Sequence, residues 1–291
     1  METNRVSLIE CPRDAMQGWK EFVPTATKIE YLETLLQVGF DTIDFGSFVS
    51  AKAIPQMADT KDVLAGIQNK GKTSLLAIVA NLRGAEEACS FPAIDFLGFP
   101  FSVSETFQQR NTNNSIAAAY ELLKNIQQLC VQSGKKLVVY ISMGFGNPYG
   151  DLYSEIIVKN WIEKIVGLGV EIISLADTVG LAKPAAVAAL TTFLIKDFPG
   201  IQTGVHLHAS PYDWVDKVQA AIDSGCRRLD SAMKGIGGCP MANDKLVGNL
   251  DTEMLIAFLK ERNLLKPLNE DALSRASAMA SMIFQSDNHS L

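Results

Sequence analysis

The chain has 291 residues, of which 47% are hydrophobic and 20% charged, and its formal net charge at pH 7 is −6. These values are typical of a globular protein with a full core, and they argue against nucleic acid or an anionic membrane surface as a partner. No apolar run approaches the ~20 residues of a membrane-spanning helix, and no apolar signal segment precedes Val6. Because the five cysteines include no Cys-x-x-Cys pair, we expect reduced thiols in a cytoplasmic protein.

Strand-like and helix-like patterns alternate along the chain. The predicted strands are 6–11, 41–45, 74–81, 93–100, 136–142, 169–175, 204–208 and 226–231. The predicted helices are 25–38, 61–69, 84–88, 115–132, 154–168, 184–197 and 214–224, and a helical C-terminal region follows at about 251–285. Such alternation predicts a parallel sheet built from βα units.

Eight strand candidates are the number that closes a (β/α)8 barrel, or TIM barrel, which occupies roughly 250 residues. An open doubly wound sheet is the alternative, but no Gly-x-Gly-x-x-Gly motif follows the first strand. We therefore predict an α/β fold in which residues 1–291 form a single TIM-barrel domain with extra C-terminal helices packed on it. Functional residues of this fold lie at the C-terminal ends of the strands.

Two of the three histidines, His206 and His208, stand two residues apart at the end of a predicted strand. Residues i and i+2 of a strand point to the same face, so both imidazoles could reach one ion or substrate. For this pair alone, two separately hydrogen-bonded histidines are the favoured alternative. Barrel closure, however, brings the first and last strands together, so Asp14 and Asn249 can join them. A carboxylate, two imidazoles and an amide oxygen suit Mg²⁺, Mn²⁺ or Zn²⁺ with open positions for substrate.

Each of these other residues also has a plainer interpretation. Asp14 could be a turn or cap residue after Pro12, and Asn249 could be a loop amide before the next helix. Arg13 could stabilise an enolate or carboxylate, or it could form a salt bridge to Asp44 or another acid. We expect substrate contacts from a set of polar residues that includes Arg13: Gln17, Asp44, Ser47, Asn111, Ser142, Asp177 and Thr178. For Asp177, capping of the next helix is slightly favoured.

A glycine-dense loop, Gly-Ile-Gly-Gly-Cys-Pro at 235–240, follows the eighth predicted strand. Its glycines allow close backbone approach and loop motion. The loop lacks the Lys-Ser/Thr of a phosphate-binding P-loop. Cys239 is therefore either a small residue packed beneath the loop or an acid/base thiol on a mobile segment.

Several segments, in order along residues 6–285, resemble the 3-hydroxy-3-methylglutaryl-CoA lyase family. They are Cys-Pro-Arg-Asp-Ala-Met-Gln at 11–17, Asp-Phe-Gly-Ser-Phe-Val-Ser at 44–50, Ser-Leu-Ala-Asp-Thr-Val-Gly at 174–180, Val-His-Leu-His at 205–208 and the glycine loop at 235–240. The Arg-Asp, His-x-His and Gly-Asn elements are shared with isopropylmalate and homocitrate synthases, which are metal-dependent Claisen enzymes. The Gly-Gly-Cys-Pro loop and Ser-Phe-Val-Ser are more specific to the lyases.

The resemblance implies a divalent metal, Mg²⁺ or Mn²⁺, held by Asp14, His206, His208 and Asn249. It also implies that Arg13 stabilises a thioester enolate and that Cys239 is the acid/base. Two positions depart from the family pattern. Asp44 stands where the family commonly has Glu, and Ala209 replaces an acidic or amide residue after His-x-His. The stretch 143–149 also differs from the usual cysteine-bearing form.

The expected activity is retro-Claisen cleavage of 3-hydroxy-3-methylglutaryl-CoA to acetyl-CoA and acetoacetate. In this interpretation His206 removes the hydroxyl proton. We expect an acyl-CoA as the small-molecule substrate and a homodimer as the assembly. The alternative is a related acyl-CoA lyase, or a Claisen enzyme like isopropylmalate or homocitrate synthase, with another 3-hydroxy acid as substrate. A non-catalytic barrel that binds a metal or acyl-CoA is a further alternative.

Overall fold

The structure is a computed structural model that describes residues 5–210, 212–238 and 247–285. Its eight strands are parallel and close into a barrel in the order β1 to β8, with β8 paired to β1. Their bounds are β1 Ser7–Glu10, β2 Thr42–Ser47, β3 Ser74–Ile78, β4 Phe96–Ser102, β5 Lys136–Ser142, β6 Ile172–Asp177, β7 Gln202–Leu207 and β8 Arg228–Ser231. The predicted TIM barrel is confirmed.

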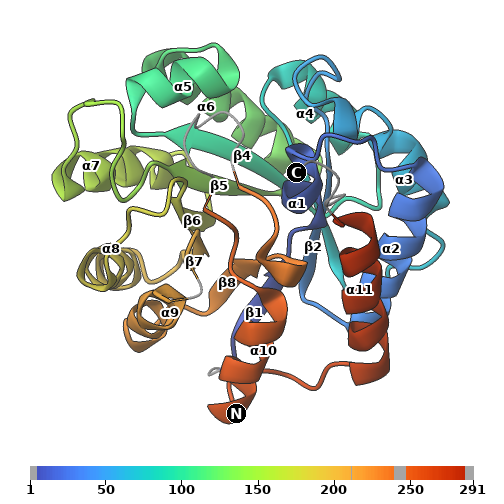
Figure 1. Ribbon diagram of the computed structural model, residues 1–291. Helices are drawn as coiled ribbons and strands as arrows, with labels where there is room; N and C mark the ends of the chain where they lie inside the picture. The colour runs from blue at the N-terminus through green and yellow to red at the C-terminus, as the bar shows by residue number, and fades with distance from the viewer. Residues whose placement is uncertain (1–4, 211, 239–246, 286–291) are drawn as a thin grey trace, which may run out of the picture.

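Helices surround the strands on all sides (Figure 1). The α-helices are α1 Pro12–Gln17, α2 Thr25–Val38, α3 Thr60–Gly66, α4 Leu82–Cys89, α5 Glu105–Thr112, α6 Ile116–Gln132, α7 Glu155–Val166, α8 Pro184–Asp197, α9 Trp214–Asp223, α10 Thr252–Glu261 and α11 Glu270–Ile283. Two short 3-10 helices, η1 Pro55–Met57 and η2 Met233–Gly235, complete the described elements. None of the helices in these residues is long and apolar enough to cross a membrane.

Two helices were not predicted, and both carry candidate site residues. α1 begins at Pro12, whose fixed φ suits the first turn of a helix, and it places Arg13, Asp14 and Gln17 on a helix rather than in a turn. α5 begins after Ser104, whose hydroxyl accepts a hydrogen bond from the backbone N–H of Phe107. Both helices are short, so neither leaves a long hydrophobic period in the sequence.

The hydrophobic residues form two separate layers. The larger layer lies between the strands and the surrounding helices. The smaller one fills one side of the barrel interior and consists of Leu76, Ile78, Val138, Tyr140 and Ile172. The strands are therefore buried on both faces, as parallel strands usually are, and the interior is a packed core rather than a channel.

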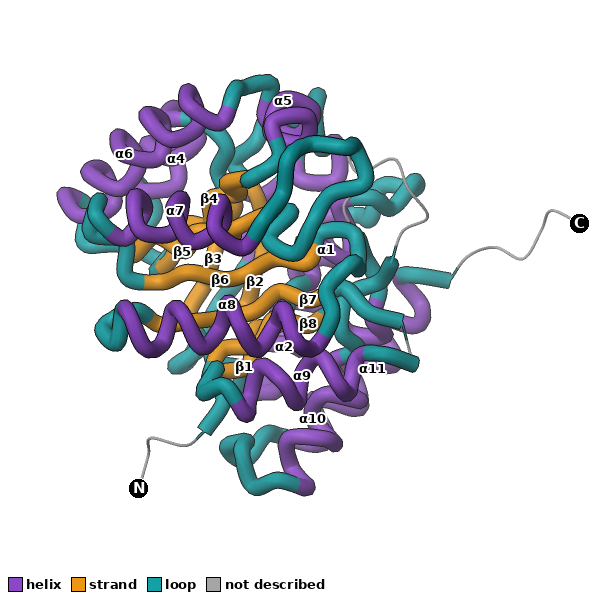
Figure 2. Tube along the Cα trace, turned by 90° about the vertical axis from the view of Figure 1, so that its left-hand side faces the viewer, coloured by secondary structure: helices purple, strands orange, loops and turns teal. Residues whose placement is uncertain are grey.

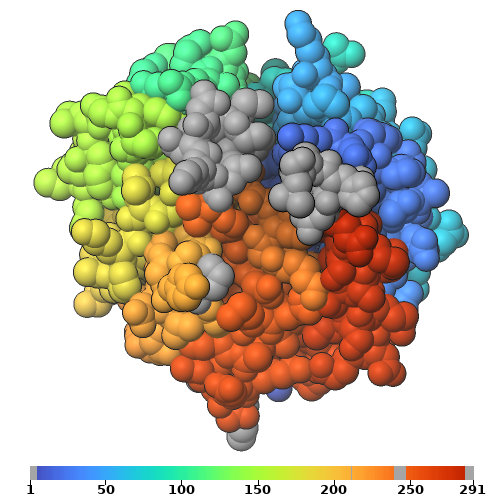
Figure 3. All heavy atoms as spheres, in the orientation of Figure 1, coloured from blue at the N-terminus to red at the C-terminus, as the bar shows by residue number. Residues whose placement is uncertain are grey.

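The C-terminal helices complete the outer ring beside the N-terminal segments. α11 packs against α2, and in Figure 3 the orange and red C-terminal atoms lie next to the blue N-terminal ones. In the side view, α1 lies at one end of the strands, where the connecting loops gather (Figure 2). The predicted helical C-terminal region is confirmed, and its position ties the end of the described chain to the first βα unit.

A buried carboxyl group on β1 holds these parts together. Glu10 accepts a hydrogen bond from the backbone N–H of Met233 at 2.9 Å and another from the hydroxyl of Thr252 at 2.5 Å. Burial, opposed by these hydrogen bonds, raises the pKa of Glu10 from its ordinary 4.5 to about 8. The carboxyl group joins β1, η2 and α10 at the seam where the barrel closes.

Replacement of this carboxyl group should change how stability depends on pH. Between about pH 4.5 and 8 the folded protein binds one proton more than the unfolded chain. The stability due to this proton is therefore complete below about pH 4.5 and is lost as pH rises through about 8, with a slope of up to ~1.4 kcal/mol per pH unit. Glu10→Gln removes the titration. As pH rises from 5 to 8, we expect the unfolding free energy of the variant, measured by urea denaturation, to increase relative to that of the wild type.

Glu87→Gln provides the matched control, because Glu87 forms an exposed ion pair with Lys61. Its unfolding free energy should follow the wild-type pH profile. An identical pH slope in Glu10→Gln and the wild type would contradict the titration of Glu10 in this range.

Candidate active site

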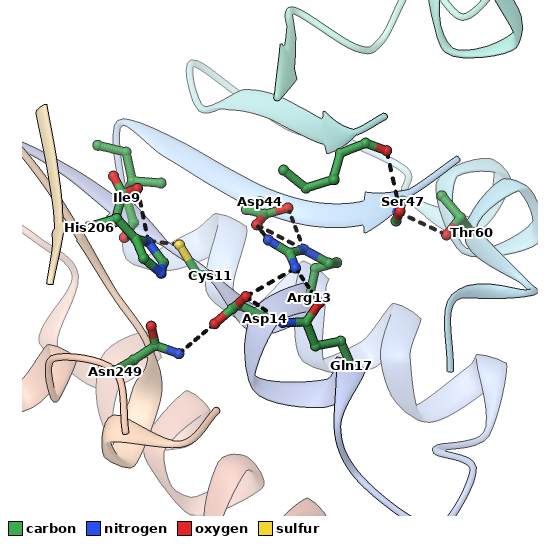
Figure 4. A network of polar contacts seen from close by, with 12 residues as sticks. Ile9, Cys11, Arg13, Asp14, Gln17, Asp44, Ser47, Thr60, His206 and Asn249 are labelled. Carbon is green, nitrogen blue, oxygen red and sulfur yellow. Dashed lines mark hydrogen bonds and ion pairs between the residues drawn. The ribbon is translucent and has the colours of Figure 1, made fainter. Parts of the chain in front are cut away.

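The first helix presents a charged cluster at the C-terminal end of the barrel. Arg13 Nη1 donates hydrogen bonds to Asp14 Oδ1 at 3.0 Å and to Gln17 Oε1 at 2.7 Å. Gln17 Nε2 in turn donates to Asp14 Oδ1 at 2.8 Å. Gln17 follows Arg13 by four residues and Asp14 by three, the spacings at which side chains meet on a helix surface. Figure 4 shows the cluster pointing toward β2 on one side and toward Asn249 on the other.

Arg13 is also paired with a carboxylate on β2. Its Nε lies 3.0 Å and its Nη2 2.5 Å from Asp44 Oδ2. Both partners are buried, so this charge-assisted pair holds the guanidinium plane in one orientation. Both interpretations of Arg13 therefore remain compatible with the structure: it forms the predicted salt bridge, and it also faces the pocket described below.

The two histidines converge on the same point. His206 is on β7, and His208 follows that strand in an isolated bridge with Asn249. Their Nε2 atoms are 3.2 Å apart. A carboxylate oxygen of Asp14 and one nitrogen from each ring all lie within 4.8 Å of one another. The predicted meeting of Asp14, His206 and His208 is thus observed.

The outer nitrogens of both rings determine what this point can bind. His208 Nδ1 is 2.9 Å from the carbonyl oxygen of Val247, and His206 Nδ1 is 3.2 Å from Asp230 Oδ2. A carbonyl or carboxylate oxygen can only accept, so both Nδ1 atoms carry the proton. With Nδ1 protonated on both rings, the two Nε2 atoms face each other, an arrangement that needs a positive charge between them, either a proton on one ring or a bound cation. These residues therefore fit a divalent metal, with hydrogen-bonded Nδ1 atoms of the kind that metal-binding histidines usually have.

The pKa values of the cluster reflect the same competition for positive charge. Burial opposes ionisation of Asp14, but Arg13 and the two imidazoles outweigh it and hold its pKa at about 2. Burial and the neighbouring His206 lower the pKa of His208 to about 4. For His206, the hydrogen bond to Asp230 and the charge of Asp14 outweigh burial and raise the pKa. Asp14 is therefore anionic and His208 neutral at pH 7, as metal ligands must be.

Asn249, in the loop between β8 and α10, lies beside this cluster. Its Nδ2 donates to Asp14 Oδ2 at 2.8 Å and to the carbonyl oxygen of Ile236 at 2.9 Å. The amide nitrogen thus faces Asp14, so a metal-ligand role would use the amide oxygen. Gly237 has φ +115° and packs so closely against Asn249 that a Cβ would not fit there. The predicted close approach of the glycine loop is observed at Gly235 and Gly237, and Cys239 lies outside the described residues.

A cavity of about 140 Å³ opens beside the histidines. The predicted site residues that line it are Arg13, Asp14, Gln17, Asp44, Asn111, Ser142, Thr178, His206 and His208. Its remaining wall is largely apolar and includes Ile78, Phe107 and Tyr140. Burial, opposed by Arg13, raises the pKa of Asp44 to about 6, so this pocket holds a carboxylate that titrates close to neutral pH.

Of the predicted residues that the structure describes, three do not line this cavity. Ser47 donates to the carbonyl oxygen of Ile78 and lies against Thr60 (Figure 4). Asn249 reaches the site through Asp14. Asp177 forms a buried ion pair with Lys217 at 3.2 Å, and it accepts a hydrogen bond from the backbone N–H of Ala182.

Lys217 connects Asp177 to the site, because it contacts both Asp177 and the backbone of His208. The Lys217 side chain is only 2% exposed, and its ammonium group also donates to the carbonyl oxygen of His208 at 3.1 Å. The Asp177–Lys217 pair therefore holds the backbone at the end of β7. Lys217 and Asp230 both belong to the support of the histidines, and neither was predicted. The sequence does contain a pattern that could have indicated Asp230. Arg228 and Asp230 stand at i and i+2 of β8, on the interior face of a strand where apolar residues are usual.

A second set of possible ligands lies on the other side of the His206 ring. Cys11, His206 and Asp230 also offer ligand atoms within 4.8 Å of one another. The thiol is fully buried, and burial together with the nearby carboxylates raises the pKa of Cys11. A protonated thiol is a poor ligand, so the Asp14–His206–His208 set has the more suitable chemistry.

A protein-family model described as HMGL-like matches residues 6–280 of the chain. The mitochondrial hydroxymethylglutaryl-CoA lyase of Mus musculus is 33% identical over 256 residues, which cover 88% of this chain and 78% of the mouse protein. The cytoplasmic 3-hydroxy-3-methylglutaryl-CoA lyase of Rattus norvegicus is 32% identical over 260 residues, covering 89% of this chain and 75% of the rat protein.

Solved structures of HMG-CoA lyases are also similar to this chain. An HMG-CoA lyase from Acinetobacter baumannii, in complex with coenzyme A and 3-methylmalate, superposes with a TM-score of 0.90 at 30% identity, over 97% of this chain and 92% of that one. The HMG-CoA lyase from Brucella melitensis gives 0.89 at 31% identity, over 97% and 99%. Fold, site and relatives together define a TIM-barrel lyase with a candidate divalent-metal site. The chain belongs to the HMGL-like family.

Loss of a ligand should distinguish the two metal-binding sets. We expect His208→Ala to weaken Mn²⁺ binding by more than the ~10–100-fold that loss of a supporting hydrogen bond costs, because it removes a ligand of the Asp14 set. Cys11→Ala removes a possible ligand of the Cys11–His206–Asp230 set only and should bind Mn²⁺ as the wild type does. Isothermal titration calorimetry on metal-stripped protein measures both affinities. The opposite result, with binding lost in Cys11→Ala and kept in His208→Ala, would place the ion at the Cys11–His206–Asp230 set.

Proposed function

We propose that the protein cleaves 3-hydroxy-3-methylglutaryl-CoA to acetyl-CoA and acetoacetate with the help of Mg²⁺ or Mn²⁺. The observation that carries this proposal is the convergence of Asp14 and the two imidazoles beside a pocket that also contains Arg13. The relatives named as HMG-CoA lyases, and the coenzyme A complex of one of them, support the acyl-CoA as substrate class.

In this proposal Asp14, His206 and His208 hold the metal, and Asn249 contributes its amide oxygen. The bound ion would supply Lewis-acid polarisation of the substrate hydroxyl and carboxylate oxygens. Arg13 is kept in a single orientation by Asp44 and faces the thioester oxygen, on which negative charge develops when the carbon–carbon bond breaks. Gln17, Asn111, Ser142 and Thr178 contact the acyl part within the same pocket, and Ser47 and Asp177 support it from outside.

The hydroxyl proton needs an acceptor. His206 was expected in that role as well as in metal binding, but a nitrogen that coordinates a metal has no free lone pair. The hydrogen bond from His206 Nδ1 to Asp230 supports the ligand role. Asp44 lines the pocket and, with a pKa of about 6, is ionised at neutral pH. We therefore propose Asp44 as a second candidate for the base.

The glycine loop would supply the final proton. The described part of the loop ends at Gly238, and Gly237 lies next to Asn249 and the backbone of Asp14. Cys239 is two residues beyond Gly237 in the sequence, and we propose that its thiol reaches a substrate held beside Asp14. We propose that it protonates the enolate carbon to give acetyl-CoA.

Metal removal tests the activity directly. Acetyl-CoA release from 3-hydroxy-3-methylglutaryl-CoA should vanish after EDTA treatment and return with Mg²⁺ or Mn²⁺, because the ion polarises the reacting oxygens. No turnover by protein that binds Mn²⁺ in calorimetry would contradict this substrate. The result would favour a related acyl-CoA lyase or synthase, and Asp44→Glu and Ala209→Asp would be the first substitutions to try on a substrate panel.

Cys239→Ser separates proton transfer from metal binding. Since general acid–base catalysis typically contributes 10²–10⁴-fold, we expect kcat to fall by roughly 100-fold or more while Mn²⁺ affinity stays at the wild-type value. Cys89→Ser is the matched control, because Cys89 is on α4 in the outer ring of helices, and it should leave both quantities unchanged. Full turnover by Cys239→Ser would exclude the thiol as the acid.

The assembly and the cell compartment also belong to the proposal. We propose a homodimer, formed by a single TIM-barrel domain in each chain and working in the cytoplasm. Curated relatives include both cytoplasmic and mitochondrial lyases. A non-catalytic metal-binding barrel is the remaining alternative, and metal binding without turnover on any acyl-CoA would favour it.

A further inference from the structure

The barrel interior contains polar atoms that no described residue satisfies. Strand pairing places Tyr140 of β5 beside Ser174 of β6, and Ser174 beside Gly204 of β7. Tyr140 Oη and Ser174 Oγ are buried and have no hydrogen-bond partner. Buried polar groups almost always find a partner, either in the protein or in an ordered water molecule. These hydroxyls begin a polar region of the barrel interior, which borders the apolar cluster at Tyr140 and continues from β6 toward β8.

Arg228 of β8 extends this polar region. The residue is 2% exposed, and its Nε and Nη2 atoms are also buried without a hydrogen-bond partner. Its side chain lies across Gly204, because a Cβ at that position would be only 2.9 Å from Arg228 Cδ and 3.1 Å from Cγ. A guanidinium group cannot lose its charge here, and a buried charge needs acceptors around it.

One unsatisfied acceptor in the barrel interior belongs to the support of the metal site. Asp230 is two residues beyond Arg228 on the same strand, so both side chains point to the interior. Asp230 Oδ2 accepts the hydrogen bond from His206 Nδ1, whereas Asp230 Oδ1 is buried without a partner. Arg228 and Asp230 thus present unpaired donors and an unpaired acceptor to the same enclosed space.

Water molecules can complete this arrangement. A buried water typically makes about three hydrogen bonds to otherwise unsatisfied groups, and the two hydroxyls can both donate and accept. We infer that Arg228 is a positioning residue for the metal site: with water enclosed in the barrel, its guanidinium group holds the Asp230 carboxylate, and Asp230 holds His206. The inference rests on the metal-binding part of the proposed function and not on the identity of the substrate.

Metal affinity tests the inference without any substrate. Arg228→Met keeps an unbranched side chain but removes the N–H donors of the guanidinium group. The Asp230 carboxylate is then no longer held in place, and His206 loses its fixed orientation. We expect Mn²⁺ affinity in calorimetry to fall about 10–100-fold, the usual effect of losing support for a metal-binding histidine. Arg228→Lys, which keeps the charge, should recover part of the affinity. Arg227→Met is the matched control from the adjacent position, whose side chain bonds to the carbonyl oxygens of Ile222 and Cys226, and it should bind as the wild type does.

A double-mutant cycle shows whether Arg228 acts through Asp230. If it does, Arg228→Met combined with Asp230→Asn should bind Mn²⁺ no more weakly than Asp230→Asn alone. Wild-type affinity in a folded Arg228→Met variant would overturn the inference, and so would additive losses in the double variant. Wild-type protein that binds no Mn²⁺ would overturn the proposed function as well, which distinguishes the two failures.

A high-resolution crystal structure of the wild-type protein tests the same point if Arg228→Met does not fold. Ordered water between the Arg228 guanidinium and Asp230 Oδ1 would support the inference. A dry interior, with Arg228 turned away from Asp230, would overturn it.

Discussion

Closure of the barrel between β8 and β1 is the constraint on which the site depends. Asp14 follows β1 and Asn249 follows β8, and the two are in hydrogen-bond contact although they lie 235 positions apart in the chain. Glu10, on the strand just before Asp14, is bonded to η2 and α10. The group that secures the seam is therefore four residues from a candidate metal ligand, so the geometry of the site is set by the same contacts that close the fold.

Within that frame, a single guanidinium group divides its charge between two carboxylates with different consequences. Asp14 also faces two imidazoles and stays strongly acidic, with a pKa of about 2. Asp44 has Arg13 as its main partner, and burial prevails, so its pKa rises to about 6. One arginine thus keeps one carboxylate permanently anionic and leaves the other able to exchange a proton near neutral pH.

The barrel and most of the cluster were predictable because they depend on patterns that the sequence shows locally. Alternating strands and helices give the topology, and the strand period places His206 and His208 on one face. The helix α1 was missed because its six residues are too few to show a period, and α5 was missed because Phe107 is its one hydrophobic residue. Lys217 and Asp230 were missed for another reason: they act on the histidines from neighbouring elements, and only the folded chain shows which carbonyl or ring nitrogen each one reaches. Ser47 follows Asp44 by three residues, yet its hydroxyl bonds to the neighbouring strand and not to the pocket.

The close packing of Arg228 on Gly204 links the sizes of two positions on neighbouring strands. Because the arginine stem occupies the volume that a side chain at 204 would need, alanine or any larger residue at 204 is compatible only with a smaller or repositioned residue at 228. A chain that lost the arginine could in turn accept a side chain at 204. In the evolution of this barrel the two positions would therefore be expected to change together, and each restricts which neighbour the other can have.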